Sequence, residues 1–280
     1  MSILKIKNIN KTFITKHKTV QTLKNINLEI EAGEFVCIVG SSGCGKTTIL
    51  NIIAGLEKAT SGSIFLNDKE IFSPGIDRTV LFQEHALFPW LRVIDNVEFG
   101  MKMLGISKKD RREKALKYLY MVKLRGFENS FIHELSGGMR QRVALARALA
   151  VDSDILLMDE PFSALDNQTK NILLDELHNI WLKTKKTIIF VTHNVDEAVY
   201  LADKVVVMNS SPGMIKKVIN NNIEEPRNKI SPEYIAVVDE IINEMSEETK
   251  KAEEEDCEYG KNIKKNSFLS NIASYLGSNI

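Results

Sequence analysis

The sequence predicts an α/β fold in which helices cover a largely parallel sheet. Between residues 155 and 208, short apolar runs typical of buried strands alternate with segments of helical periodicity. A further apolar run at residues 35–39 leads into a glycine-rich turn and then into an amphipathic helix. Alternation of this kind favours a parallel sheet with helices on its faces.

The individual elements follow from local patterns. Alternating apolar and polar residues at 4–6 and 28–30 predict half-buried strands in a β-rich N-terminal subdomain, and residues 34–39 predict a more deeply buried strand. Further strands are expected at residues 63–66, 79–82, 155–158, 187–191 and 204–208, and helices at residues 46–54, 107–120 with Ser107 as cap, 165–183 and 195–201. Strand signals are scarce from about residue 91 to 135, and we expect a helical subdomain inserted into the core at about residues 91–150.

The chain divides accordingly into two parts. We expect one domain at residues 1–230, which includes the helical insertion, and a charged C-terminal extension at residues 231–280. Within the extension, residues 232–248 predict a helix, residues 249–266 a solvated or disordered segment and residues 268–276 a short helix.

Composition and charge limit the possible partners. Lys+Arg and Asp+Glu both number 37, so nothing in the net charge favours nucleic acid or an anionic membrane surface. The scattered cysteines Cys37, Cys44 and Cys257 are typical of a reduced, cytosolic protein. The first residues predict a strand rather than a secretory signal, and no apolar stretch approaches the roughly 18–20 residues that span a bilayer. Any membrane role is therefore expected to involve a separate partner.

Residues 40–47 fit the phosphate-binding pattern G-x-x-x-x-G-K-[ST] at every specified position. Glycines let backbone N–H groups approach phosphate oxygens, and the following helix points its N-terminus at the anion. Lys46 is expected to contact the β- and γ-phosphates of ATP, and Thr47 to ligate Mg²⁺. The alternative is a chance glycine-rich turn, but the strand before it and the helix after it are what the motif requires. The expected nucleotide-binding residues of this segment are Gly40, Ser41, Ser42, Gly43, Cys44, Gly45, Lys46, Thr47 and Thr48.

Two acidic residues follow the apolar strand at residues 155–158. Asp159 has the position of a carboxylate that holds Mg²⁺ directly or through water. Glu160 can then reach a water in line with the γ-phosphate, as general base or as orienting group. The alternative is a strand that simply ends in two acidic residues.

A second glycine-rich helix start lies at residues 136–138. Ser136 is a typical N-cap, and Gly137 and Gly138 leave the helix N-terminus exposed to an anion. The alternative is an ordinary cap. An ordinary nucleotide-binding domain does not need two phosphate-facing segments, which suggests an ATPase that closes its site only against a second copy.

Over about residues 2–215 these motifs closely resemble the ATPase subunits of ABC transporters. Residues 135–139 resemble the family's signature, with Met139 where many members carry Gln. The resemblance implies that Phe13 stacks on adenine, that Asp166 belongs to the D-loop and that His193 contacts the γ-phosphate. It further implies the catalytic residues Lys46, Gln83, Glu160 and His193, and the Mg²⁺ ligands Thr47, Gln83 and Asp159. Taken singly, each has an alternative: Phe13 in the core, Gln83 on the surface, Asp166 as a helix cap and His193 as a satisfied strand-end histidine.

The resemblance also implies an assembly. Two copies would form a head-to-tail dimer in which each ATP contacts Lys46 of one copy and Ser136 and Gly138 of the other. ATP would close this pair, and hydrolysis through Glu160 and His193 would reopen it. The pair would sit at the cytoplasmic face of the membrane on integral permease subunits, which in turn meet a solute-binding protein.

A longer stretch is similar to one branch of bacterial importers. Residues 77–78, 83–97 and 207–215 resemble the nitrate/sulfonate/taurine branch, which importers of riboflavin or thiamine precursors share. Phe88, Pro89 and Trp90 form an apolar patch expected to receive a permease helix, the alternative being packing inside the helical subdomain. Met214 departs from the basic residue often found there, and residues 216–280 match nothing in the branch. Other ABC alternatives are a soluble ATPase of repair or translation, and outside the family a P-loop kinase or GTPase, which would not need residues 135–139.

Overall fold

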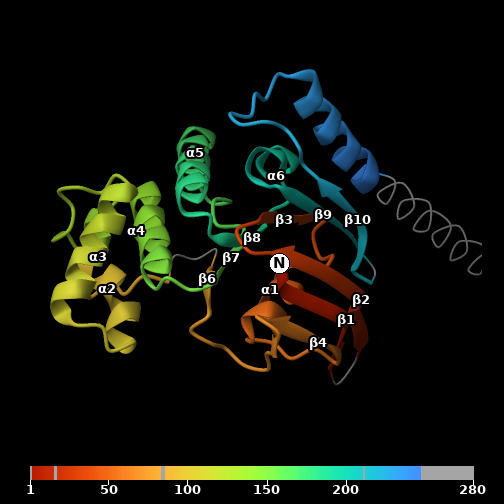
Figure 1. Cartoon of the computed structure of the whole chain (residues 1–280), viewed down its shortest axis with the longest axis horizontal. Coiled ribbons are helices and arrows are strands. Elements are labelled where there is room, and N and C mark those ends of the chain that lie inside the picture. Colours follow the sequence, from red (N-terminus) through yellow and green to blue (C-terminus); the bar gives the residue numbers. More distant parts are fainter. Residues whose placement is uncertain (1, 16–17, 83–85, 211, 247–280) are drawn as a thin grey trace, which may run out of the picture.

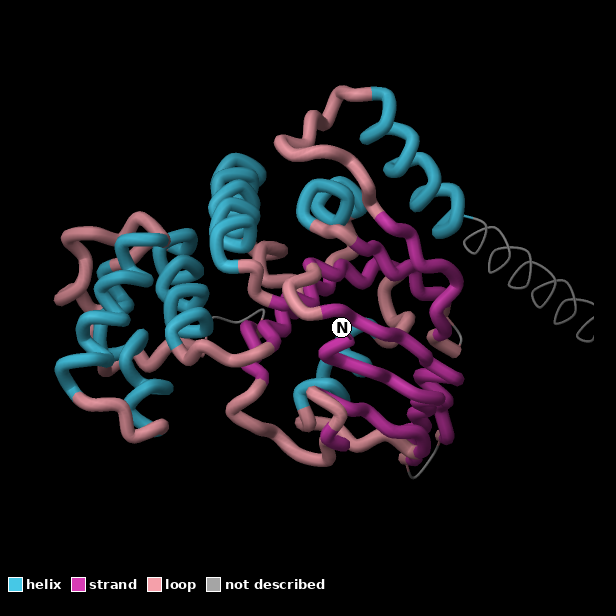
Figure 2. The backbone as a smooth tube through the Cα atoms, in the orientation of Figure 1, coloured by secondary structure: helices cyan, strands magenta, loops and turns pink. Residues whose placement is uncertain are grey.

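A computed structural model describes residues 2–15, 18–82, 86–210 and 212–246. These residues form two sheets, with helices packed on the larger sheet and α1 between the two sheets (Figures 1 and 2). The predicted α/β class is confirmed. Within the described residues, no helix is both long enough and apolar enough to cross a bilayer.

The larger sheet has six strands in the order β10-β9-β3-β8-β7-β6. They are β3 (Phe35–Gly40), β6 (Arg78–Leu81), β7 (Ile155–Asp159), β8 (Thr187–Val191), β9 (Lys204–Asn209) and β10 (Met214–Asn220). All except β10 pair in parallel, as the alternation of strands and helices predicted.

Strand β10 was not predicted from the sequence. It pairs antiparallel with β9 at the edge of the sheet, directly after the turn at Gly213. A register shift falls between Ile215 and Lys217, so the two lysines there interrupt the apolar–polar alternation that would have marked a strand.

The smaller sheet is antiparallel, in the order β2-β1-β4-β5. Its strands are β1 (Ser2–Ile14), β2 (Thr19–Glu31), β4 (Ser61–Leu66) and β5 (Lys69–Glu70). The predicted short strands at residues 4–6, 28–30 and 63–66 lie within β1, β2 and β4. The β-rich N-terminal segment is therefore a long hairpin joined by β4.

The helices are α1 (Lys46–Ala54), α2 (Val93–Met103), α3 (Lys108–Met121), α4 (Gly137–Ala150), α5 (Asn167–Thr184) and α6 (Val195–Leu201), with a 3₁₀ turn at Ile132–Glu134. Ser107 caps α3 as predicted, because its Oγ accepts from the Asp110 N–H at 3.2 Å. Figure 1 shows α2, α3 and α4 together on one side of the molecule, and α4 shares a hydrophobic core with the larger sheet.

The central strand β3 separates two hydrophobic cores. Phe35, Cys37 and Val39 belong to the core that includes α4, α5 and α6. Val36 and Ile38 point the other way, into the core between α1 and the smaller sheet. Because successive side chains of a strand alternate between faces, this fully buried strand anchors both layers.

Residues 232–246 form a helix that packs on the main core, where Tyr234 and Ile241 are buried. The predicted helix at 232–248 is thus present as far as residue 246. The predictions for residues 249–266 and 268–276 lie outside the described residues. Our division of the chain at residue 231 remains a prediction.

Candidate nucleotide-binding site

The phosphate-loop segment connects the end of β3 to the start of α1. Gly43 and Gly45 have φ of +81° and +99°, a backbone conformation that residues with a side chain rarely adopt. At Gly40 the limit is space, because a Cβ there would lie 2.6 Å from the Met208 carbonyl oxygen of β9. These positions need glycine for the loop to hold its shape.

The Lys46 ammonium lies folded over this loop. The residue is 7% exposed, and Nζ donates to the carbonyl oxygens of Gly40 at 2.9 Å and Ser41 at 3.0 Å. A buried charge needs such partners. The loop thus holds a positive charge beside the N-terminus of α1, an arrangement suited to an anion.

Thr47 and Asp159 join α1 to the end of β7. The Thr47 Oγ1 donates to Asp159 Oδ1 at 3.1 Å. Burial raises the pKa of Asp159 above its ordinary value, partly offset by the Thr47 hydrogen bond, and the neighbouring Glu160 adds to the rise. A carboxylate in this setting favours a cation close by. Thr48 follows in the first turn of α1.

Glu160 and His193 meet across the ends of β7 and β8. The His193 Nδ1 lies 3.0 Å from Glu160 Oε2, and the Glu160 N–H donates to the Val191 carbonyl at 3.0 Å. Glu160 has a φ of +42°, which is uncommon for a residue with a side chain and is often found at functional sites. Because β3, β8 and β7 are neighbours, their carboxyl ends bring the phosphate loop, His193 and Glu160 to one edge of the sheet.

Ser136 and Asp166 cap neighbouring helices. Ser136 Oγ accepts from the Met139 N–H at 3.3 Å at the start of α4, and Asp166 Oδ1 accepts from the Thr169 N–H at 3.0 Å at the start of α5. The cap bonds lower the pKa of Asp166. A Cβ on Gly138 would lie 2.7 Å from Thr169 Cγ2, so the glycine lets the two helix starts approach.

Helix α4 lies away from helix α1 of the same chain. Figure 1 shows α4 on one side of β6 and β7 and α1 on the other. The structure therefore brings together Lys46, Thr47, Asp159, Glu160 and His193, and it brings Ser136–Gly138 next to Asp166. Helix α4, which Ser136 begins, and helix α1, which follows the phosphate loop, lie on opposite sides of these strands.

Phe13 and Gln83 complete the predicted set. Phe13 on β1 is 38% exposed and belongs to neither core, and the Lys11 ammonium lies 4.5 Å from its ring centroid. Gln83 lies outside the described residues, so the structure says nothing of it.

The patch at residues 88–90 is divided between two environments. The Phe88 ring lies 4.4 Å from that of Phe99 in α2, whereas Trp90 is 71% exposed. Asn96, fully buried, holds this loop by accepting from the Phe88 N–H at 2.9 Å and donating to the carbonyls of Phe88 and Arg92. No role for Asn96 was predicted from the sequence, and only its polar character on an apolar helix face could have indicated one.

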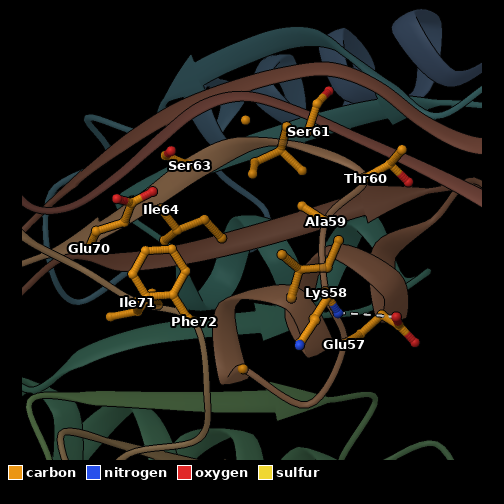
Figure 3. A pocket seen from close by; sticks show the side chains of 14 residues that line it. Glu57, Lys58, Ala59, Thr60, Ser61, Ser63, Ile64, Glu70, Ile71 and Phe72 are labelled. Carbon is orange, nitrogen blue, oxygen red and sulfur yellow. Dashed lines mark hydrogen bonds between the residues drawn. The ribbon is translucent and has the colours of Figure 1, made fainter.

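A separate hollow of about 310 Å³ lies beyond the C-terminal end of α1, near β4 (Figure 3). Figure 3 shows Ile64, Ile71 and Phe72 on one side of it and Glu57 and Lys58 on the other. The Glu57 carboxylate already accepts from Lys11 Nζ at 2.7 Å and from the Lys58 N–H at 3.1 Å. We assign no nucleotide to this hollow.

Comparisons with known proteins identify the family. The family model described as ABC transporter matches residues 23–163. An uncharacterized ABC transporter ATP-binding protein of Methanocaldococcus jannaschii is 51% identical over 249 residues, which cover 89% of this chain and 93% of that protein. The nitrate import ATP-binding protein NrtD of Synechocystis is 47% identical, with 85% and 93% covered. The aliphatic sulfonates import ATP-binding protein SsuB of Bacillus cereus is 44% identical, with 86% and 94% covered.

Solved structures show the same fold. The ATP-binding cassette MJ0796, in a dimeric post-hydrolysis state bound to ADP and Pi, superposes with a TM-score of 0.70 at 33% identity, covering 78% of this chain and 99% of that one. The chain belongs to the ABC transporter family and is an ATP-binding ATPase. Within that family it lies in the nitrate/sulfonate branch of importers, as an energy-coupling subunit, which confirms the resemblance seen in the sequence.

Proposed function

We propose that two copies of this chain share each ATP, and that closing and reopening of the pair drives import of a small solute through a membrane permease. The observation that carries this proposal is the separation of two phosphate-facing segments within one chain. The phosphate loop lies at the start of α1, and Ser136–Gly138 lie at the start of α4, across β6 and β7 (Figure 1). A second copy, turned head to tail, would bring its α4 to this chain's ATP. The dimeric cassette MJ0796 supports this arrangement.

ATP would bind along the phosphate loop. The Lys46 ammonium now donates to two carbonyl oxygens. Phosphate oxygens carry charge and make stronger hydrogen bonds, so Lys46 is expected to exchange these partners for the β- and γ-phosphates. Backbone N–H groups from Ser41 to Thr48 would cradle the phosphates, and the exposed ring of Phe13 would stack on adenine.

The Thr47 and Asp159 oxygens fit a Mg²⁺ ion. Both are hard ligands, and they lie 3.1 Å apart at the rim of the phosphate loop. Magnesium usually takes one or two protein oxygens together with phosphates and water, which this pair can provide. When bound, it would neutralise negative charge on the β- and γ-phosphates. Gln83 is proposed as a third ligand.

Glu160 and His193 are proposed to act on the γ-phosphate and its attacking water. Glu160 would accept the water's proton or orient the water, while His193, whose side chain is 63% exposed, would contact the γ-phosphate. Their 3.0 Å contact keeps both groups at the same edge of the sheet. Ser136, Gly137, Gly138 and the Asp166 loop of the partner copy would close the other side.

The membrane partner is proposed to dock near residues 88–90. Pro89 and Trp90 are the exposed members of this patch, and an exposed aromatic side chain is a frequent interface residue. The pair of copies would then sit peripherally at the cytoplasmic face, with the solute-binding protein on the far side. The solute is proposed to be small and anionic, as nitrate and sulfonate are, with a vitamin precursor as alternative. Co-purification with a permease would separate either from a soluble ABC ATPase.

The experiment that tests the shared site compares Ser136→Ala and Lys46→Ala with a control variant. Ser136→Ala should bind ATP as the wild type does at monomeric concentrations, yet lose at least tenfold in hydrolysis, because it removes a contact to the partner's nucleotide. Lys46→Ala should lose both binding and hydrolysis. Fluorescent ATP binding and phosphate release measure the two properties.

The control is Ser107→Ala. Ser107 caps α3 as Ser136 caps α4, so both changes should lower stability by roughly 1 kcal/mol. Only Ser136→Ala should impair hydrolysis. Normal hydrolysis in Ser136→Ala would contradict the shared site.

A further inference from the structure

The C-terminal segment at residues 221–234 contacts α6 at both of its ends. Figure 1 shows the chain after β10 passing next to α6 before the last described helix. Helix α6 spans only Val195–Leu201 and begins two residues after His193. So short a helix is marginal by itself and depends on its packing partners.

At the C-terminal end of α6, two side chains donate hydrogen bonds to backbone carbonyls that have no partner within the helix. Asn221 Nδ2 donates to the carbonyls of Val199 at 2.8 Å and Ala202 at 2.9 Å. Arg227 Nη1 donates to those of Val199 at 3.2 Å and Tyr200 at 3.0 Å. The last carbonyls of a helix have no partner within it, so these contacts fix that end.

At the N-terminal end, Asp196 in the first turn receives two partners. The Tyr234 hydroxyl lies 2.7 Å from Asp196 Oδ1 and 2.9 Å from its carbonyl oxygen, and Lys229 Nζ donates to Oδ2 at 2.7 Å. Tyr234 is 2% exposed. Burial, together with the Asp196 carboxylate, strongly raises the pKa of Tyr234, so its hydroxyl stays protonated and donates.

We propose that Asn221, Arg227, Lys229 and Tyr234 form a clamp that fixes α6 and thereby sets the position of His193 against Glu160. These are positioning residues for hydrolysis, and the clamp rests on the proposed role of His193. Asp196 lies three residues from His193, whose Nδ1 is 3.0 Å from Glu160. A displacement of about 1 Å at a catalytic group can cost up to a hundredfold in rate, so loss of one clamp contact should be measurable.

Tyr234→Phe tests the clamp, because it removes the hydroxyl and keeps the buried ring. We expect kcat for ATP hydrolysis to fall roughly fivefold while KM stays within about twofold. Lys229→Met removes the other partner of Asp196 from a more exposed position and should lower kcat by about twofold. If Tyr234→Phe does not fold, Lys229→Met provides the test in its place.

A double-mutant cycle separates positioning from a general loss of folded enzyme. With His193→Ala already present, Tyr234→Phe should cause no further loss, because its effect acts through His193. If Tyr234→Phe lowers kcat by the same factor in the His193→Ala background as in the wild type, the clamp would be overturned. Tyr120→Phe, on the exposed side of α3, is the control and should keep full kcat.

The same variants distinguish failure of the clamp from failure of the proposed role of His193. Full kcat in Tyr234→Phe and Lys229→Met, beside a low kcat in His193→Ala, would overturn the clamp and leave the proposed function intact. Full kcat in His193→Ala would overturn the role of His193 and the clamp with it.

Discussion

Asp159 is a single residue of the binding site whose negative charge lowers the stability of the folded protein. It lies at the end of an apolar strand, and burial raises its pKa. A raised carboxyl pKa means that folding disfavours the ionised form, so stability falls as pH rises from the ordinary aspartate pKa of 3.8 through the folded-state pKa. At neutral pH the charged side chain therefore destabilises the nucleotide-free protein.

Asp159→Asn should raise the unfolding temperature of the nucleotide-free protein while abolishing hydrolysis. Asparagine carries no charge to bury and can still accept from Thr47. The gain should be modest, roughly 2 °C, because water screens a partly buried group. Calorimetry at pH 7 measures it, with Asp239→Asn on the exposed face of the last helix as control. A lower unfolding temperature in Asp159→Asn than in the wild type would contradict the account.

At the scale of elements, His178 ties α5 to the C-terminal segment. It is 5% exposed, and its Nε2 lies 3.1 Å from Glu225 Oε1. Burial lowers the pKa of His178, Glu225 opposes that shift, and Arg227 adds to it. The net direction is downward, so the neutral ring donates to Glu225 rather than forming an ion pair.

The stability of the folded protein should therefore decrease as pH falls below the ordinary histidine pKa of 6.5. Between the two pKa values the unfolded chain binds more protons than the folded one, so the free energy of unfolding rises with pH there. His178→Gln should flatten this dependence in unfolding temperatures measured from pH 5 to 8. His133→Gln, at an exposed position, should keep the wild-type slope. An unchanged slope in His178→Gln would refute the assignment.

Elements with regular patterns were predictable from the sequence, and those set by distant contacts were not. The helix at 195–201 and the strand at 187–191 were predicted with the bounds observed, because apolar periodicity defines both. Strand β10 was missed because two lysines break its alternation. The contacts of Tyr234 and Arg227 with α6 could not be predicted, since they join residues that are far apart in the sequence and no local pattern encodes them.

At the scale of the whole molecule, we propose that one chain carries halves of two different ATP sites. Sequence motifs identified both halves, and the parallel strand order explains why Lys46, Asp159, Glu160 and His193 meet. That α4 lies on the other side of β6 and β7 from α1 follows from the inserted helices, whose orientation no local pattern encodes. A site completed by a second copy accounts for both facts.

Light scattering on Glu160→Gln tests this claim most directly. The variant should bind ATP without hydrolysing it, so the closed pair should accumulate at twice the 31.6 kDa of one chain. Adding Lys46→Ala should return it to the mass of one chain, because ATP no longer binds. A Glu160→Gln protein that stays at 31.6 kDa with ATP bound would contradict the shared site.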